Sequence, residues 1–378
     1  MEFRPEKKLG FGLMRLPLRN AGDDTDIDIE TVKQMVDLFL EQGFTYFDTA
    51  WMYHGFASEN AVKEALVKRH PRDSFTLATK LHADYIETEE DRDRIFYAQL
   101  EKTGAGYFDY YLIHDVEDVF LDKYEGLHVF DWAIEKKKQG LVRHVGFSFH
   151  DSPEVLDRVL SAHPEMEFVQ LQINYLDWES QRIQSRANYE TAVRHGKPVI
   201  VMEPVKGGTL ARVPESVETL FRSHDRNCSP ASWAVRFAAS LPNVMVVLSG
   251  MSSMDQIRDN TGYMKNLKPL SEEEKALCLQ AAEMIRKGVR VPCTGCSYCT
   301  VGCPSSIAIP KYIRLYNEDT AKSQDQVMRV VSRDAYAGLQ AKFGSPLDCV
   351  RCGQCETVCP QRLHVPDLML EIAAYYRD

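Results

Sequence analysis

The chain has 378 residues, with 45 Lys plus Arg against 55 Asp plus Glu and a formal net charge of −10 at pH 7. It has no basic stripe and no apolar run of about 18 residues, so we expect neither a nucleic-acid partner nor a membrane span. The charged start, Met1 to Lys8, lacks the apolar centre of a signal peptide, and we therefore expect a cytoplasmic protein.

Short β-branched and aromatic segments alternate with amphipathic stretches over roughly the first 265 residues. We predict strands at Gly10–Met14, Thr45–Thr49, Thr76–Lys80, Asp109–Ile113, Val142–Ser148, Val169–Tyr175, Val199–Met202 and Met245–Leu248. Helical patterns lie between them, at Ile29–Glu41, Glu59–Lys68, Glu89–Thr103 and Val129–Gln139. Gly43, Gly104 and Gly140 follow three of these patterns, as a left-handed C-terminal cap requires.

This alternation predicts an α/β protein with a parallel sheet, and eight units favour a closed (β/α)₈ TIM barrel. An open, doubly wound sheet is the alternative. The composition changes near Arg286–Pro292. We therefore predict a barrel domain at 1–285 and a second, mainly helical domain at 286–378, with a helix at Gln324–Lys342.

Eight of the ten cysteines fall into two runs with the same spacing. In each run three cysteines are separated by two residues, and a fourth follows after three more, directly before Pro304 or Pro360. A 4Fe–4S cluster needs four thiolates, and in this pattern the Cys before Pro serves the other cluster. The first cluster would take Cys293, Cys296, Cys299 and Cys359, and the second Cys349, Cys352, Cys355 and Cys303.

The spacing resembles that of bacterial two-cluster ferredoxins, with a longer insert between the runs. A pair of zinc sites is the alternative. Zinc is bound by pairs of cysteines, however, and has no use for the third Cys that stands three positions after each pair. Cys228 and Cys278 are interpreted as small buried hydrophobic residues.

Four polar residues lie at or near the ends of three consecutive predicted strands: Asp48, Tyr53, Lys80 and His114. The carboxyl ends of barrel strands share one mouth, so we expect the four side chains to converge. Tyr53 could protonate an alkoxide formed by hydride delivery to a carbonyl, and Lys80 could stabilise the phenolate. Asp48 would hold Lys80, and His114 would orient the carbonyl oxygen.

These residues, together with Leu9–Gly12, Phe47–Ala50, Asp109–His114 and Gly146–Ser148, resemble the aldo-keto reductase family over roughly residues 5–265. The resemblance implies a (β/α)₈ barrel, a catalytic tetrad of the four residues above, and NAD(P)H lying across the mouth. A small carbonyl or alcohol would be the substrate.

The resemblance also suggests nucleotide contacts. Ser148 and Gln172 would hold the carboxamide, although Phe149 stands where the family has Asn, and Met202 takes the place of a stacking aromatic. Lys206, Gly207 and Gly208 would hold the pyrophosphate. After the last strand the candidates are Ser249, Gly250, Gln256, Asp259 and Asn260, where neutral residues leave the choice of NADH or NADPH open.

Nicotinamide moves two electrons together, whereas iron–sulfur clusters move one at a time. A flavin such as FMN, or a ferredoxin or flavoprotein partner, could join the two. One alternative is therefore a flavin- or ferredoxin-linked electron-transfer enzyme without ordinary aldo-keto chemistry, and another is a structural role for the clusters. Candidates for the substrate wall are Trp51, Met52, His54, Phe56 and Trp178.

Overall fold

The computed structural model describes residues 3–20, 22–321 and 326–377. Eight parallel strands close into a barrel in the order β1 to β8, which confirms the barrel and excludes the open sheet. The strands are β1 Leu9–Gly12, β2 Tyr46–Asp48, β3 Thr76–His82, β4 Phe108–Val116, β5 Val142–Phe149, β6 Phe168–Gln172, β7 Val199–Met202 and β8 Val244–Ser249.

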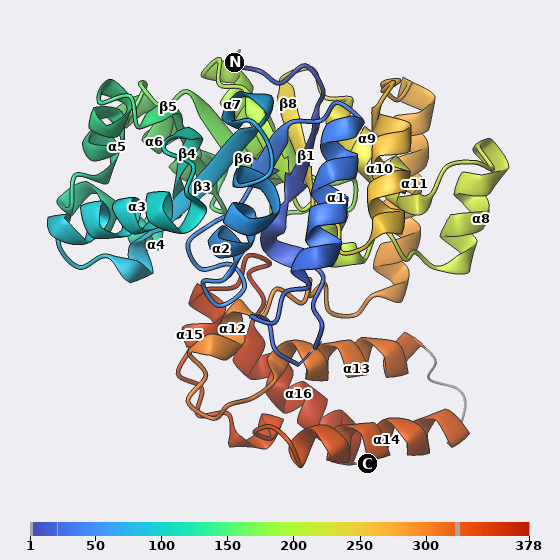
Figure 1. The fold of residues 1–378 in the computed structure, drawn as a ribbon. Helices are drawn as coiled ribbons and strands as arrows, with labels where there is room; N and C mark the ends of the chain where they lie inside the picture. Colours follow the sequence, from blue (N-terminus) through green and yellow to red (C-terminus); the bar gives the residue numbers. More distant parts are fainter. Residues whose placement is uncertain (1–2, 21, 322–325, 378) are drawn as a thin grey trace.

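Helices surround the barrel (Figure 1). They are α1 Ile29–Glu41, α2 Ser58–Val62 with a π-helical continuation at Lys63–Val67, α3 Glu89–Thr103, α4 Asp118–Gly126, α5 Val129–Lys138, α6 Pro153–Ala162, α7 Ser185–Arg194, α8 Glu215–His224, α9 Pro230–Ala239, α10 Met254–Met264 and α11 Glu272–Gly288. Gly43, Gly104 and Gly140 follow α1, α3 and α5 with φ of 80°, 66° and 76°, so the three predicted caps are confirmed.

Several strand ends differ from the prediction. β3 continues to His82 and β4 to Val116, and the backbone of His82 pairs with that of His114. The apolar pattern ends earlier because polar side chains face the mouth there, but backbone pairing does not depend on side-chain polarity. Lys80 and His114 therefore lie inside their strands rather than at their ends. β1 ends at Gly12 and β6 at Gln172, before the predicted Met14 and Tyr175.

The interior of the barrel is filled by apolar side chains from most of the strands, including Tyr46, Tyr110, Phe168 and Leu248. A separate, larger core lies between strands and helices and includes Phe11, Phe39 and Phe47. Gly146 allows β5 to pass close to β6, because a Cβ added to it would lie 2.4 Å from the Phe168 carbonyl oxygen.

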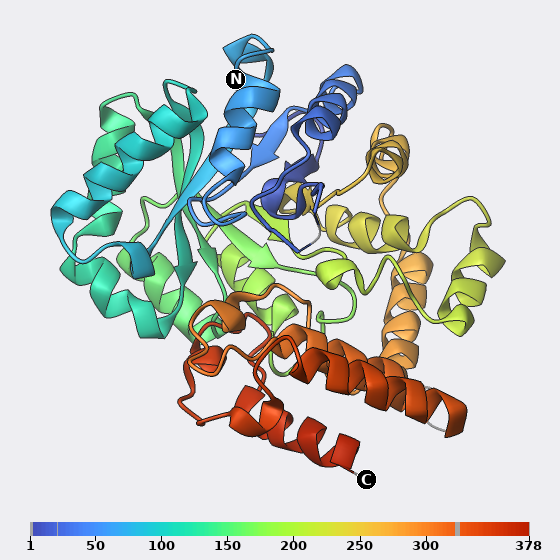
Figure 2. The same cartoon turned by 60° about the horizontal axis from the view of Figure 1, so that its bottom comes forward.

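The C-terminal unit contains the short helices α12 Tyr298–Val301 and α15 Gln354–Thr357 and the longer helices α13 Ile309–Ala321, α14 Gln326–Gln340 and α16 Val365–Arg377. Residues 324 and 325 of the predicted helix lie outside the described residues. The unit has its own apolar core, built around Tyr312, Tyr316, Met369 and Ile372. Figures 1 and 2 show it packed against one end of the barrel. Among the described residues no helix is long and apolar enough to cross a membrane.

The close approach at Gly146 gives a stability prediction. Gly146→Ala should lower the free energy of unfolding by roughly 1–3 kcal/mol, because the new methyl group meets backbone rather than a flexible side chain. Gly262→Ala is the control, since Gly262 lies in α10 with no atom within 4 Å of an added Cβ, and it should be neutral or stabilising. Equal melting temperatures for the two variants would contradict this account.

Candidate functional site

The four polar residues predicted to converge do meet at the barrel mouth. The Lys80 ammonium donates to the Asp48 carboxylate, to the Thr49 carbonyl oxygen at 2.8 Å and to the Tyr53 phenol oxygen at 3.4 Å. The Tyr53 and His114 rings lie 6.1 Å apart between centroids. All three protons of the ammonium thus have an acceptor, and the phenol hydrogen is left free to point elsewhere.

Burial sets the protonation of this group. Lys80 and Asp48 are almost fully buried, and the Gln170 amide donates to the second oxygen of Asp48 at 3.2 Å. Burial lowers the pKa of Lys80, and the Asp48 carboxylate opposes this change. Burial, with the nearby Asp48 and Glu203 carboxylates, raises the pKa of Tyr53 well above its usual value. The phenol is therefore protonated at neutral pH and holds a proton to donate.

His114 carries no charge at neutral pH. Burial lowers its pKa well below the usual value, and the neighbouring His82 and Lys80 act in the same direction. Its Nδ1 atom is buried and has no hydrogen-bond partner among the described residues. A neutral imidazole at this position can donate one hydrogen bond to a substrate oxygen.

A group of charged residues beside His114 was not predicted from the sequence. Asp115 has a left-handed backbone with φ of 57°, and its carboxylate lies 3.6 Å from His82 Nε2 and 3.9 Å from His150 Nε2. Glu117 lies near Asp115 and Asp151, and burial followed by Asp115 raises its pKa to about 9. The sequence signal that could have indicated this group is that Asp115 directly follows His114 in the chain.

Three residues predicted to hold the carboxamide or the pyrophosphate of a nucleotide contact the C-terminal unit instead. Lys206 donates to both oxygens of Asp177, at 2.7 and 2.6 Å, and to Gln361 Oε1 at 2.6 Å. Gln172 bonds to Asp177 at 2.9 Å and accepts from Gln361 at 3.1 Å. Gly207 faces Thr294, whose carbonyl oxygen would lie 2.3 Å from an added Cβ.

The remaining predicted contacts are differently placed. Ser148 is buried and accepts from the Asp115 amide at 2.8 Å, Met202 is half-buried, and Gly208 and Gly250 are partly exposed. Beyond β8, Gln256 and Asp259 are exposed on α10. Asn260 is buried, with Ser249 Oγ 3.4 Å away. The adenine end of the predicted binding path is therefore open. The residues predicted for the pyrophosphate and the carboxamide are bonded within the protein, and they do not fit a nucleotide in this arrangement.

Two of the candidate substrate-wall residues have structural roles instead. His54 is buried, accepts from the Leu16 amide at 3.0 Å and bonds to the Asp24 carbonyl at 2.9 Å. Trp178 packs against Tyr189 and Phe237. Trp51 and Phe56 stack edge to face near the mouth, and Phe56 is 40% exposed.

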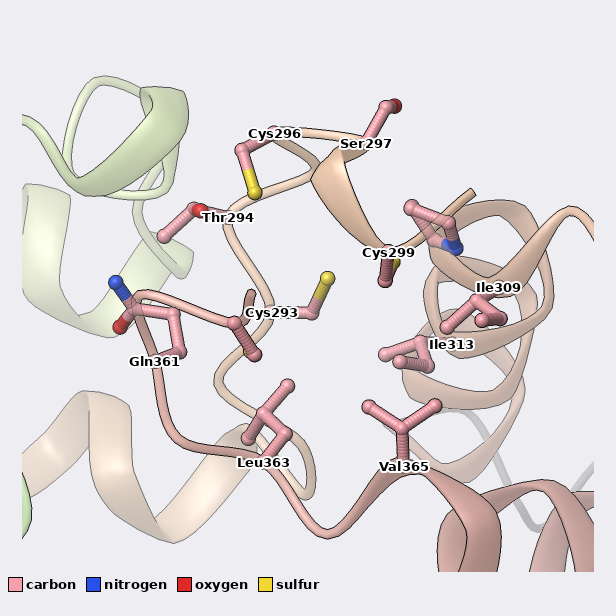
Figure 3. A pocket seen from close by; sticks show the side chains of 12 residues that line it. Cys293, Thr294, Cys296, Ser297, Cys299, Ile309, Ile313, Gln361, Leu363 and Val365 are labelled. Carbon is pink, nitrogen blue, oxygen red and sulfur yellow. The ribbon is translucent and has the colours of Figure 1, made fainter. Parts of the chain in front are cut away.

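The eight clustered cysteines line two cavities. Cys293, Cys296, Cys299 and Cys359 line one, together with apolar side chains such as Ile309 and Leu363. Cys303, Cys349, Cys352 and Cys355 line the other. Figure 3 shows the Cys293 and Cys296 sulfurs turned toward the first cavity, with Thr294 and Gln361 lining it beside the barrel. These are the two sets that the spacing predicts for two clusters.

The cavities suit iron–sulfur clusters in their donor chemistry. Each presents four soft sulfur donors in apolar surroundings. Burial raises the pKa of Cys296 to about 11 and that of Cys355 to about 11, so an isolated thiolate is unfavourable and the positive iron of a cluster would compensate. Among the described residues, no group of three or more His, Cys, Asp or Glu is arranged to hold a single metal ion.

The fold and site define a (β/α)₈-barrel oxidoreductase with an appended iron–sulfur unit. The aldo/keto reductase family matches residues 8–283, and a 4Fe-4S dicluster domain matches residues 292–363. The chain belongs to the aldo/keto reductase family.

Known proteins agree with this assignment. The chain is 30% identical over 245 residues to an aldo-keto reductase of Mycolicibacterium vanbaalenii, covering 64% of this chain and 79% of that protein. An aldo-keto reductase of Bacillus halodurans in its holo form has a TM-score of 0.58 at 24% identity, covering 74% of this chain and 95% of the other. One from Klebsiella pneumoniae, solved with NADPH, has a TM-score of 0.57 at 18% identity, covering 74% and 90%. The two solved structures share the fold.

The cysteine cavities give a prediction about ligand pairing. Cys359→Ala should remove the same cluster as Cys293→Ala and about half of the iron and sulfide, although Cys359 belongs to the second run. Cys278→Ala is the control, because Cys278 is buried among barrel residues. Iron and sulfide analysis with EPR of the anaerobic protein measures this, and loss of different clusters in the two variants would contradict the pairing.

Glu117 gives a pH prediction. The folded protein keeps the Glu117 proton above pH 4.5, where an unfolded chain releases it, so folding binds more protons and stability falls as pH rises toward 9. Glu117→Gln should make the melting temperature fall less steeply over this range. Glu273→Gln on the exposed start of α11 should leave the wild-type slope unchanged, and equal slopes for all three proteins would contradict this role.

Proposed function

We propose that this protein is an oxidoreductase that interconverts a small carbonyl compound and its alcohol at the barrel mouth. In this proposal the reaction exchanges electrons through two 4Fe–4S clusters in the C-terminal unit. The observation that carries it is the meeting of Tyr53, Lys80, Asp48 and His114 at the barrel mouth. We assign the barrel reaction to residues 1–285 and the clusters to 286–378; helix α11 spans this boundary.

Tyr53 is the proton donor in this proposal. Its phenol is protonated because burial raises its pKa, and its oxygen accepts from the Lys80 ammonium. When the phenol gives its proton to the substrate oxygen, the phenolate that remains lies beside a fixed positive charge. Asp48 and the Thr49 carbonyl keep that charge in place, and neutral His114 orients the substrate oxygen.

Reduction of a carbonyl to an alcohol takes two electrons and two protons. Tyr53 would give one proton to the oxygen, and a hydride from NAD(P)H would bring the two electrons and the hydrogen for the carbon. The two clusters held by the eight cysteines would each carry one electron at a time, and together they could exchange the pair with an outside partner.

The first cysteine loop contacts the barrel on this side. Arg15, after β1, donates to the Thr294 carbonyl oxygen at 3.4 Å and lies 3.7 Å from Glu203, and the Tyr298 hydroxyl lies 3.8 Å from the Met14 sulfur. The Glu203 charge in turn raises the pKa of the Tyr53 phenol, so the loop lies on the same side of the barrel as the proton donor.

Nicotinamide is the reductant that membership of the family suggests, and the Klebsiella relative binds NADPH. NAD(P)H is the proposed donor or acceptor of electrons, and it would have to bind without Lys206 and Gln172, which are bonded within the protein. A ferredoxin or flavoprotein is the proposed electron partner, and the cytoplasm the proposed location. No comparison supports bound FMN, which stays a prediction.

The alternative function is electron transfer that uses the barrel without carbonyl chemistry. The closeness of the first cysteine loop to the mouth favours it as much as the main proposal. The two differ in whether the Tyr53 proton is needed, so one variant separates them.

Tyr53→Phe should reduce the rate of carbonyl reduction by about 10²–10⁴-fold, the usual contribution of a positioned acid. Tyr97→Phe is the control, because Tyr97 is half exposed on α3, and it should act as wild type. The measurement is turnover of a panel of aldehydes and ketones by the cluster-loaded protein under anaerobic conditions, with reduced viologen or NADPH as donor. Full carbonyl turnover by Tyr53→Phe would reject the proposal.

A further inference from the structure

Lys206 is a buried charged residue at the mouth that the proposed reaction does not use. The family resemblance assigns it to a phosphate, but its side chain is buried and each of its bonds goes to the protein. Asp177 neutralises it with two contacts of 2.6 and 2.7 Å. A pyrophosphate at this position would have to displace a carboxylate from a buried ion pair, which leaves that carboxylate uncompensated.

The partner of this ion pair comes from the cysteine-rich unit. Gln361 is 2% exposed, and it joins Lys206 at 2.6 Å to Gln172 at 3.1 Å. We call Lys206, Asp177, Gln172 and Gln361 the interdomain joint. Gln361 follows Cys359 by two residues, so the joint fixes the chain just beyond the cysteine that spacing assigns to the first cluster.

Two neighbouring contacts also join the C-terminal unit to the barrel. Arg362 donates to Asp151 at 2.5 Å and to the His150 carbonyl at 2.9 Å, which fastens the chain to the segment after β5. On the other side, Gly207 has φ of 62° and leaves room for the Thr294 carbonyl. Barrel loops after β5, β6 and β7 thus each meet the C-terminal unit with complementary groups, which indicates a built interface.

Lys206 also lies near the first cysteine cavity. Gln361, which accepts a hydrogen bond from Lys206 at 2.6 Å, lines that cavity together with Cys293, and so does Thr294, which faces Gly207. Net charge and hydrogen bonds around the sulfurs are main determinants of the reduction potential of a cluster. A charge in this position would therefore act through space on a cluster held by the four cysteines of the first cavity, whatever substrate the barrel takes.

We infer that the interdomain joint replaces the pyrophosphate and carboxamide subsite of the barrel, and that Lys206 and Asp177 are positioning residues that set the reduction potential of the first cluster. The inference rests on the proposed function for the presence of a cluster in the first cavity. It does not depend on carbonyl turnover, which the experiment does not measure. A nicotinamide bound across the mouth would therefore have to do without Lys206 while the joint is formed.

The test is a redox titration of the anaerobic, cluster-loaded protein followed by EPR, with the first cluster identified as the signal that Cys359→Ala loses. Lys206→Met removes a positive charge and should make that cluster about tenfold harder to reduce, about 59 mV for a one-electron couple. Asp177→Asn removes a negative charge and should shift the potential in the opposite direction. Lys197→Met, before β7 at the far end of the strand, is the charge control and should shift neither cluster.

Opposite shifts distinguish an electrostatic role from a structural one, because general loosening would move both variants in the same direction. Titration with NADPH provides the second readout, and Lys206→Met should bind it no more weakly than wild type. The inference is overturned if the first cluster keeps its potential in both variants, or if Lys206→Met weakens NADPH binding tenfold.

Gln361→Leu covers the case in which a charge variant does not fold. It breaks the link to the C-terminal unit while Asp177 still holds Lys206, so iron content should stay at the wild-type level. The connection at 286–292 should then become more sensitive to limited proteolysis, whereas unchanged protection there would contradict the joint. Val350→Leu in the exposed second cysteine run is the matched control.

Discussion

Closure of eight parallel strands is the constraint on which the rest of this protein depends. Because all strands run in the same direction, their carboxyl ends share one rim. Side chains from β2, β3 and β4 meet there as the Asp48, Lys80 and His114 group, although up to 66 positions separate them in the sequence. The same rim also offers loops after β5, β6 and β7 to the C-terminal unit, so one geometric condition creates both this group of side chains and the interface.

Two buried ion pairs, one on each side of the mouth, perform different tasks in this arrangement. Lys80 with Asp48 lies beside the Tyr53 phenol, and we propose that it stabilises the deprotonated form of that phenol. Lys206 with Asp177 lies beside Gln361 and the first cysteine cavity. Burying each pair is costly, because two charges leave water, and additional hydrogen bonds offset part of that cost. In the first pair Lys80 also donates to the Thr49 carbonyl and to Tyr53. In the second pair Lys206 also donates to Gln361, which comes from the cysteine-rich unit.

The barrel and the group of polar side chains at its mouth were largely predictable because their signals are local or periodic. Alternating strands and helices predicted the topology, and strand-end positions predicted the meeting of Asp48, Tyr53, Lys80 and His114. The exact ends of β3 and β4 were not predictable, since backbone pairing continues past the apolar pattern. The roles of His54 and Trp178 also depended on contacts with distant segments, which single positions in a sequence do not reveal.

By itself the sequence determined the family, the barrel and the two sets of cysteines. The reason is that the order of the motifs, the alternation of strands and helices and the spacing of the cysteines can all be seen along the chain. Only the tertiary structure decided what Lys206, Gln172 and Gly207 contact. Their partners Asp177, Gln361 and Thr294 lie up to 189 positions away in the sequence. Whether a lysine faces a phosphate or a carboxylate depends on which chain segment packs over it, and that is settled by docking of the C-terminal unit on the rim.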